Sequence, residues 1–177
     1  DIPFMFSNPA PEMDFLFDGI VPLNTLVGCD AGGGSGKGYF IQELIASLCI
    51  GRTLLDSFPV HESRKVLWLQ SEEDIPEMHR RFERISNTFE LSGADTDSIA
   101  ENLVMYPKLA EPLNRKDEDG RTCPTQFFNW LAEEVTRVQP GLIVIDPRSH
   151  YFAGEENSNT DVAAFMNLLT TLIPMVQ

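Results

Sequence analysis

The sequence predicts an α/β domain with a mainly parallel central sheet. Short β-type runs alternate with helical patterns along the chain, which is the order typical of βαβ units. Residues 142–145 (LIVI) are apolar on both faces, as a central parallel strand requires. At 177 residues the chain is long enough for one well-packed domain and too short for two ordinary ones. We therefore expect one domain over residues 1–177, with residues 1–14 as an N-terminal extension.

The elements of the first third can be placed from turn residues and apolar spacing. Residues 25–29 (TLVGC) form a short apolar run that stops at a glycine-rich stretch, and they predict the first strand. Apolar side chains at helical spacing predict a helix over residues 39–50. Gly51 and Pro59 indicate that residues 51–63 form a loop.

The middle third contains the clearest helix. Residues 65–70 (KVLWLQ) predict the second strand. Residues 76–89 carry an apolar stripe at helical spacing, and Pro76 suits the first turn of a helix. A weaker helical pattern covers residues 95–101, and residues 103–106 predict a third strand.

The last third repeats the alternation. Residues 114–122 are polar and predict a loop, which the helix of residues 125–138 follows. Residues 142–145 predict the fourth strand. A loop over residues 147–159 then precedes a final helix over residues 161–173.

Composition and charge exclude several classes of protein. No apolar run approaches the roughly 18 residues that a membrane span needs, so no membrane partner is expected. Thirteen Lys and Arg against 27 Asp and Glu give a net charge of −14. A broad duplex-binding face would carry the opposite sign, so any contact with nucleic acid has to be local.

The three cysteines indicate a reducing compartment. Cys29, Cys49 and Cys123 share no metal-binding spacing. Cys29 and Cys49 fall in segments that are predicted to be core. We expect reduced, buried thiols and a cytoplasmic protein.

The strongest chemical motif lies between the first predicted strand and the first predicted helix. It reads Ala31, Gly32, Gly33, Gly34, Ser35, Gly36, Lys37 and Gly38. A loop of this composition points backbone N–H groups at phosphate oxygens, and the following helix directs its positive end at the same anion. Lys37 adds a charge that can follow the β- and γ-phosphates. A flexible glycine loop is the alternative, but the Gly36-Lys37 pair between strand and helix favours phosphate binding.

Two acidic positions at strand ends complete the predicted site. Asp146 follows the apolar run LIVI, where P-loop enzymes place the carboxylate that holds Mg²⁺; an ordinary capping aspartate is the alternative. Glu72 follows the second strand and can polarise a water for attack on the γ-phosphate. Its alternative role is to complement a helix dipole. We expect Glu73 and Asp74 to serve the start of that helix.

These motifs together resemble a known family. The order is the glycine loop, then SEED leading into MHRRF over residues 71–82, then LIVIDPRSHYF over residues 142–152, then GEENSN over residues 154–159. This order is similar to that of the RecA-fold ATPases of the RepA type, which are hexameric replicative helicases. The resemblance runs from about residue 10 to the end. It implies a three-layer RecA-like P-loop NTPase that binds ATP and Mg²⁺, in a homo-oligomeric, hexameric ring that acts on single-stranded DNA.

The resemblance also implies roles for individual residues. Lys37 would bind phosphate, Glu72 would activate water, and Asp146 would order Mg²⁺. Arg80, Arg81 and Arg148 match basic positions of the family without an assigned role.

The sequence departs from the family at two points. Gly38 replaces the Ser or Thr whose hydroxyl ligates Mg²⁺, so hydrolysis would be weakened or lost. A serine at this position is expected to be sterically mild and to tighten the metal. The family's further strand with its γ-phosphate sensor, and its arginine finger, are expected beyond Gln177.

Three hypotheses of function follow. The first is an ATP-hydrolysing motor domain of a RepA-like DNA helicase. The second is a nucleotide-dependent switch or assembly ATPase with weak or no turnover, to which Gly38 would be suited. The third is a P-loop small-molecule kinase, which explains Lys37 and Asp146 but not the acids at positions 72 and 73.

Overall fold

The computed structural model describes residues 2–10 and 12–176, and it confirms the predicted α/β class. A three-stranded parallel sheet lies at the centre, in the order β4 (Leu103–Pro107), β3 (Val66–Gln70) and β7 (Leu142–Asp146). In this register Gln70 is level with Asp146 on one side and with Pro107 on the other. All three strands therefore end at the same edge of the sheet, which is where ligands bind in open parallel sheets.

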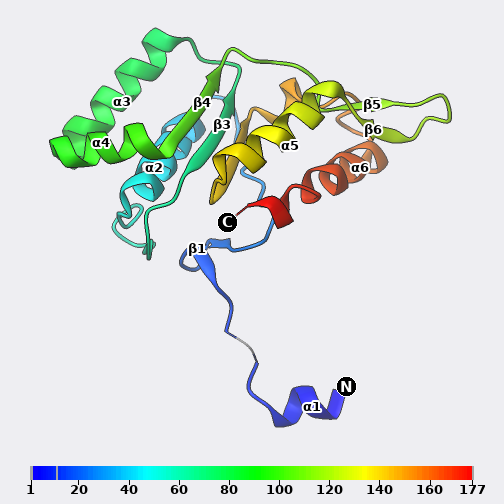
Figure 1. Ribbon diagram of the computed structural model, residues 1–177, viewed down its shortest axis with the longest axis horizontal. Coiled ribbons are helices and arrows are strands. Elements are labelled where there is room, and N and C mark those ends of the chain that lie inside the picture. Colours follow the sequence, from blue (N-terminus) through cyan, green and yellow to red (C-terminus); the bar gives the residue numbers. More distant parts are fainter. Residues whose placement is uncertain (1, 11, 177) are drawn as a thin grey trace.

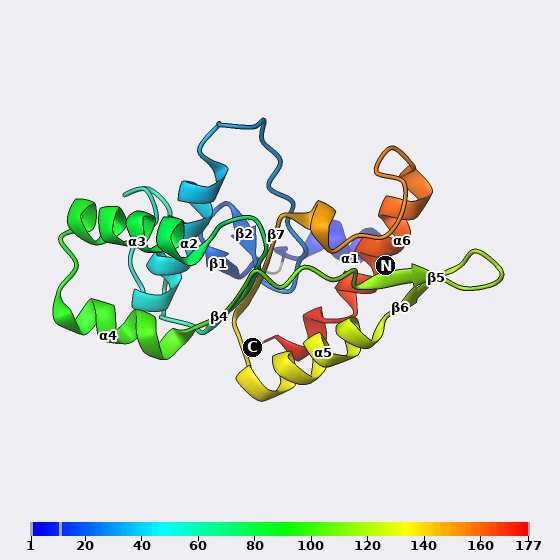
Figure 2. The same cartoon turned by 90° about the horizontal axis from the view of Figure 1, so that it is seen from above.

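Helices cover both faces of the sheet, so the domain has three layers. Figure 2 shows α2 (Lys37–Ile50), α3 (Ile75–Phe89) and α4 (Gly93–Asn102) on one side, and α5 (Gln126–Val138) and α6 (Asn159–Thr170) on the other. Side chains of β3 alternate between the two layers. Leu67 and Leu69 pack in the core with α5 and α6, while Val66 and Trp68 pack with α2 and α3. Because both faces are covered, every residue of β3 is buried.

Side-chain caps fix where the helices begin. The Asp74 carboxylate accepts a hydrogen bond from the Glu77 N–H (2.8 Å), which starts α3 and confirms the helix-start role predicted for Asp74. Ser92, Thr125 and Ser158 cap α4, α5 and α6 in the same way. The final helix ends at Thr170 rather than at the predicted residue 173. A short 3₁₀ helix, η2 (Ile173–Met175), follows it.

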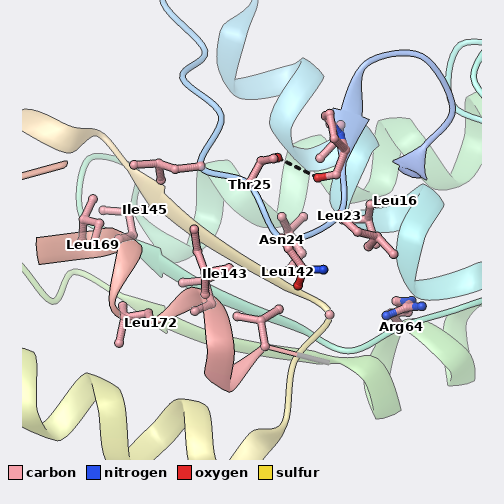
Figure 3. A pocket seen from close by; sticks show the side chains of 16 residues that line it. Leu16, Leu23, Asn24, Thr25, Arg64, Leu142, Ile143, Ile145, Leu169 and Leu172 are labelled. Carbon is pink, nitrogen blue, oxygen red and sulfur yellow. Dashed lines mark hydrogen bonds between the residues drawn. The ribbon is translucent and has the colours of Figure 1, made fainter. Parts of the chain in front are cut away.

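The predicted strand over residues 25–29 is wrong, because this segment is exposed and has no regular structure. A strand needs a hydrogen-bonded neighbour. Among the described residues, β7 pairs with β3 and does not pair with this segment. Apolar cavities lie between the segment and β7, the larger one of about 560 Å³. Figure 3 shows the smaller, of about 220 Å³, between Thr25 and the Leu142–Ile145 side of β7. The Thr25 hydroxyl donates to the Pro22 carbonyl instead (2.7 Å).

Several short elements were not expected from the sequence. The predicted loop over residues 114–122 contains the hairpin β5 (Asn114–Lys116) and β6 (Thr122–Pro124). The strands β1 (Phe15–Phe17) and β2 (Val21–Pro22) form a second small hairpin, and a 3₁₀ turn, η1 (Arg148–His150), follows β7.

The predicted N-terminal extension carries one short helix. Figure 1 shows α1 (Ile2–Ser7) well away from the body of the domain, at the end of an extended segment. Residues 1, 11 and 177 of the predicted domain lie outside the described residues. Among the helices that the structure describes, none is both long and apolar enough to cross a membrane.

The three cysteines differ in exposure, and Cys123 is half-buried rather than buried as predicted. Cys49 is buried as predicted, but Cys29 is exposed because its segment is not a core strand. Burial raises the pKa of the Cys49 thiol to about 12, so the reactive thiolate is scarce at pH 8.

We expect a thiol reagent at pH 8 to label Cys29 rapidly and to leave Cys49 unmodified until the protein is denatured. Mass spectrometry of labelled peptides checks this, and rapid native labelling of Cys49 would contradict it.

Candidate functional site

The glycine loop of residues 31–38 has a backbone that side chains would hinder. Gly34 (φ 75°) and Gly36 (φ 91°) both adopt left-handed conformations that favour glycine. The Ser35 N–H donates to the Gly32 carbonyl (3.2 Å), and α2 begins at Lys37, directly after Gly36. No atom lies within 4 Å of where a Cβ would be at Gly32, Gly33, Gly34 or Gly36. The loop thus presents the N-terminus of a 14-residue helix, with room for an anion beside it.

Lys37 and Asp146 face one another at the edge of the sheet. The Lys37 ammonium lies 3.5 Å from Asp146 Oδ1, and both side chains are largely buried. The glycine-loop lysine and Asp146 therefore meet at the edge where the parallel strands end. Both residues also line the larger cavity beside β7, together with Asp30 and Arg148.

The two glutamates after β3 have different surroundings. The Ser71 N–H donates to the Asp146 carbonyl (3.2 Å), which holds the turn after β3 against the end of β7. Glu72 is exposed at this same edge. Glu73 is half-buried; it forms an ion pair with Arg81 on α3 and accepts a hydrogen bond from Gln42 Nε2 on α2 (3.2 Å). The expectation that Glu73 serves the start of the helix is therefore wrong.

The position of Glu73 affects its charge. Burial raises the pKa of Glu73 above its ordinary value, the Arg81 guanidinium lowers it, and the neighbouring Asp146 carboxylate raises it again. The two carboxylates therefore influence each other at the edge where Lys37 lies, and each already has a cationic partner: Arg81 for Glu73 and Lys37 for Asp146.

Gly38 is more crowded than its sequence context indicated. A Cβ atom at this position would collide with Arg81 Nη1 and lie 2.9 Å from Glu73 Oε1. A serine here is therefore not sterically mild, contrary to the expectation from the sequence. The Arg81 side chain cannot simply turn away, because Glu73 and Glu77 both bind its guanidinium and it stacks over the Tyr39 ring.

The aromatic residues that follow β7 pack in the hydrophobic core. Tyr151 is fully buried, and its hydroxyl donates to the Leu109 carbonyl (2.7 Å). Burial raises the pKa of Tyr151 to about 12, so it stays protonated. Phe152 packs against Phe165 of α6. Both aromatics are packing residues of the core.

The residues present fit a metal–nucleotide complex better than a metal alone. Among residues 2–10 and 12–176, no three His, Cys, Asp or Glu side chains cluster as a metal cage. Mg²⁺ characteristically takes one or two carboxylates and completes its shell with phosphates and water. Asp146 beside the glycine loop suits that arrangement, with the phosphates supplied by a nucleotide.

Comparison with known families gives a match over almost the whole chain. The model of the family described as AAA domain (AAA_25) matches residues 4–173, and this is a family of P-loop NTPases. The chain belongs to this AAA domain family. It is a P-loop protein of the nucleotide-binding ATPase class. A search of curated proteins finds no match to this chain.

Sequence reasoning missed the contacts that two residues make beside the glycine loop. Gln42 and Glu73 both lie at the junction of the glycine-loop helix with the turn after β3. Gln42 stands one helical turn after Gly38, so the two share a face of α2. A polar residue at that spacing within an apolar helix was the available signal.

Proposed function

We propose that this AAA domain is the ATP-binding motor domain of a RepA-like hexameric DNA helicase that hydrolyses ATP with Mg²⁺. The observation that carries this proposal is the approach of Lys37 to Asp146 beside the glycine loop, in a chain that the AAA domain model matches over residues 4–173. The RepA-like assignment is supported by the motif order of residues 71–82 and 142–159.

Each residue at the edge has a distinct role in this proposal. Residues 31–38 hold the phosphates through backbone N–H groups, and Lys37 neutralises the β- and γ-phosphate charge. Asp146 holds the Mg²⁺, which supplies charge neutralisation at the phosphates when bound. Glu72, exposed at the same edge, accepts a proton from the attacking water.

A switch or assembly ATPase with little turnover is the second candidate. The observation that favours it is Gly38, which provides no hydroxyl for the metal. Such a protein would bind ATP tightly and release it unhydrolysed, or hydrolyse it too slowly for a motor.

The deciding experiment measures ATP hydrolysis by the assembled protein with Mg²⁺, with and without single-stranded DNA. We expect hydrolysis that rises when single-stranded DNA is added. Duplex DNA of the same length is the control, because a net charge of −14 disfavours a broad duplex-binding surface. Tight ATP binding with negligible turnover would contradict the motor domain and favour the switch or assembly ATPase. Phosphate transfer to a small metabolite would indicate a kinase.

A further inference from the structure

The space over Gly38 is filled by the Glu73–Arg81 ion pair, in which Arg81 Nη1 lies nearest to where a Cβ of residue 38 would be. P-loop proteins place a Ser or Thr hydroxyl on Mg²⁺ at this position. Here Glu73 Oε1 lies 2.9 Å from where a Cβ of residue 38 would be. A carboxylate oxygen from the turn after β3 therefore stands close to where the missing hydroxyl would begin.

Glu73 is held in this place from two helices. Arg81 on α3 pairs with the carboxylate and is itself bound by Glu77 Oε1 (3.0 Å). Gln42 on α2 donates to Glu73 Oε2 (3.2 Å). A glutamate has several rotatable bonds, so these partners define its position before any ligand arrives.

An unsatisfied buried atom lies beside this carboxylate. Gln42 is fully buried, and its Oε1 has no hydrogen-bond partner, although its Nε2 binds Glu73. A buried acceptor without a donor is costly, so its partner is expected to arrive with a ligand. Water molecules in the shell of a bound metal ion are donors of this kind.

We propose that Glu73 replaces the missing hydroxyl and, with Asp146, serves the Mg²⁺ that accompanies ATP. This role rests on the proposed function, because the metal arrives with the nucleotide. Gly38 is then a requirement of the site, since any side chain there would displace the Glu73–Arg81 pair. Arg81 and Gln42 are positioning residues that hold the carboxylate.

The test is the Mg²⁺ dependence of nucleotide binding, measured by titration with a fluorescent, non-hydrolysable ATP analogue. For Glu73→Gln we expect the Mg²⁺ concentration at half-effect to rise about 5- to 10-fold, because one carboxylate is lost. Affinity measured in EDTA should not fall, which also shows that the variant is folded. The matched control is Glu83→Gln, which makes the same change of charge at an exposed position of α3 outside the Glu73–Arg81 pair; it should leave the Mg²⁺ dependence unchanged.

A rescue variant separates the metal role from a structural one. Gly38→Ser combined with Glu73→Gln and Arg81→Ala should recover most of the Mg²⁺ response, because serine restores the hydroxyl and alanine removes the guanidinium that would collide with its Cβ. Equal Mg²⁺ dependence in Glu73→Gln and Glu83→Gln, or no recovery in the triple variant, would overturn the role of Glu73 and leave the proposed function standing. A wild-type protein that binds no analogue at any Mg²⁺ concentration would overturn the proposed function and this role together.

Discussion

Glu72→Gln is expected to lower the rate of ATP hydrolysis about 10²- to 10⁴-fold while leaving ATP binding intact, because a general base contributes about this much. The amide keeps the size of the side chain and cannot accept the proton of the attacking water. Glu72 is exposed at the edge where Lys37 and Asp146 meet, and its substitution leaves the glycine loop and the Lys37–Asp146 pair unaltered in sequence. The measurement is steady-state phosphate release by the assembled protein, paired with a direct titration of ATP.

The matched control for this prediction is Glu83→Gln. Glu83 is an exposed glutamate on α3. The variant makes the same change of charge and should keep the wild-type rate. A Glu72→Gln protein that hydrolyses ATP as fast as Glu83→Gln would show that Glu72 is not the base.

The parts of the fold that packing determines could be predicted from the sequence. The strands β3 and β7 and the helices α3 and α5 lie within about two residues of the predicted ranges. Their apolar residues are spaced so that side chains are buried on both faces of the sheet. In β3, for example, Leu67 packs in one hydrophobic core and Trp68 in the other. Local composition and tertiary packing agree in these elements.

The segment of residues 25–29 shows where local pattern is insufficient. Its composition is that of a strand, yet a strand forms only when a neighbour supplies hydrogen bonds, and the free edge of β7 lies across a cavity. The hairpin of β5 and β6 was missed for the opposite reason. Most of its residues are polar, so it has no apolar pattern. The antiparallel pairing of β5 with β6, in which Asn114 is opposite Pro124, forms the hairpin instead.

The candidate site was predictable where one motif fixes one position. Lys37 and Asp146 each belong to a short motif next to a strand or helix, and the structure places their charged groups 3.5 Å apart. The surroundings of Glu73 could not be predicted, because they depend on α2 and α3 packing side by side. Only the structure shows that the Glu73–Arg81 pair lies against Gly38.

Lys37→Ala is expected to weaken ATP binding about 10- to 100-fold, because a charge-assisted contact to phosphate is worth about 1.5–3 kcal/mol. The loss has a second source in this protein. Lys37 is the partner of Asp146, so its removal leaves a carboxylate unpaired where the phosphates would arrive. The fold should persist, because the Lys37 side chain is not part of either hydrophobic core.

Lys65→Ala is the control for this substitution. Lys65 is exposed and precedes β3, so it lies at the opposite edge of the sheet from the glycine loop. Both variants remove one positive charge from a chain of net charge −14. A general electrostatic effect on ATP would therefore appear in both, and a specific one only in Lys37→Ala.

Isothermal titration of ATP into the wild type, Lys37→Ala and Lys65→Ala tests most directly whether residues 31–38 hold the triphosphate. The account predicts one ATP per chain, the same Kd for wild type and Lys65→Ala, and a Kd about 10- to 100-fold higher for Lys37→Ala. Equal affinity in all three proteins, or no binding by the wild type, would contradict it.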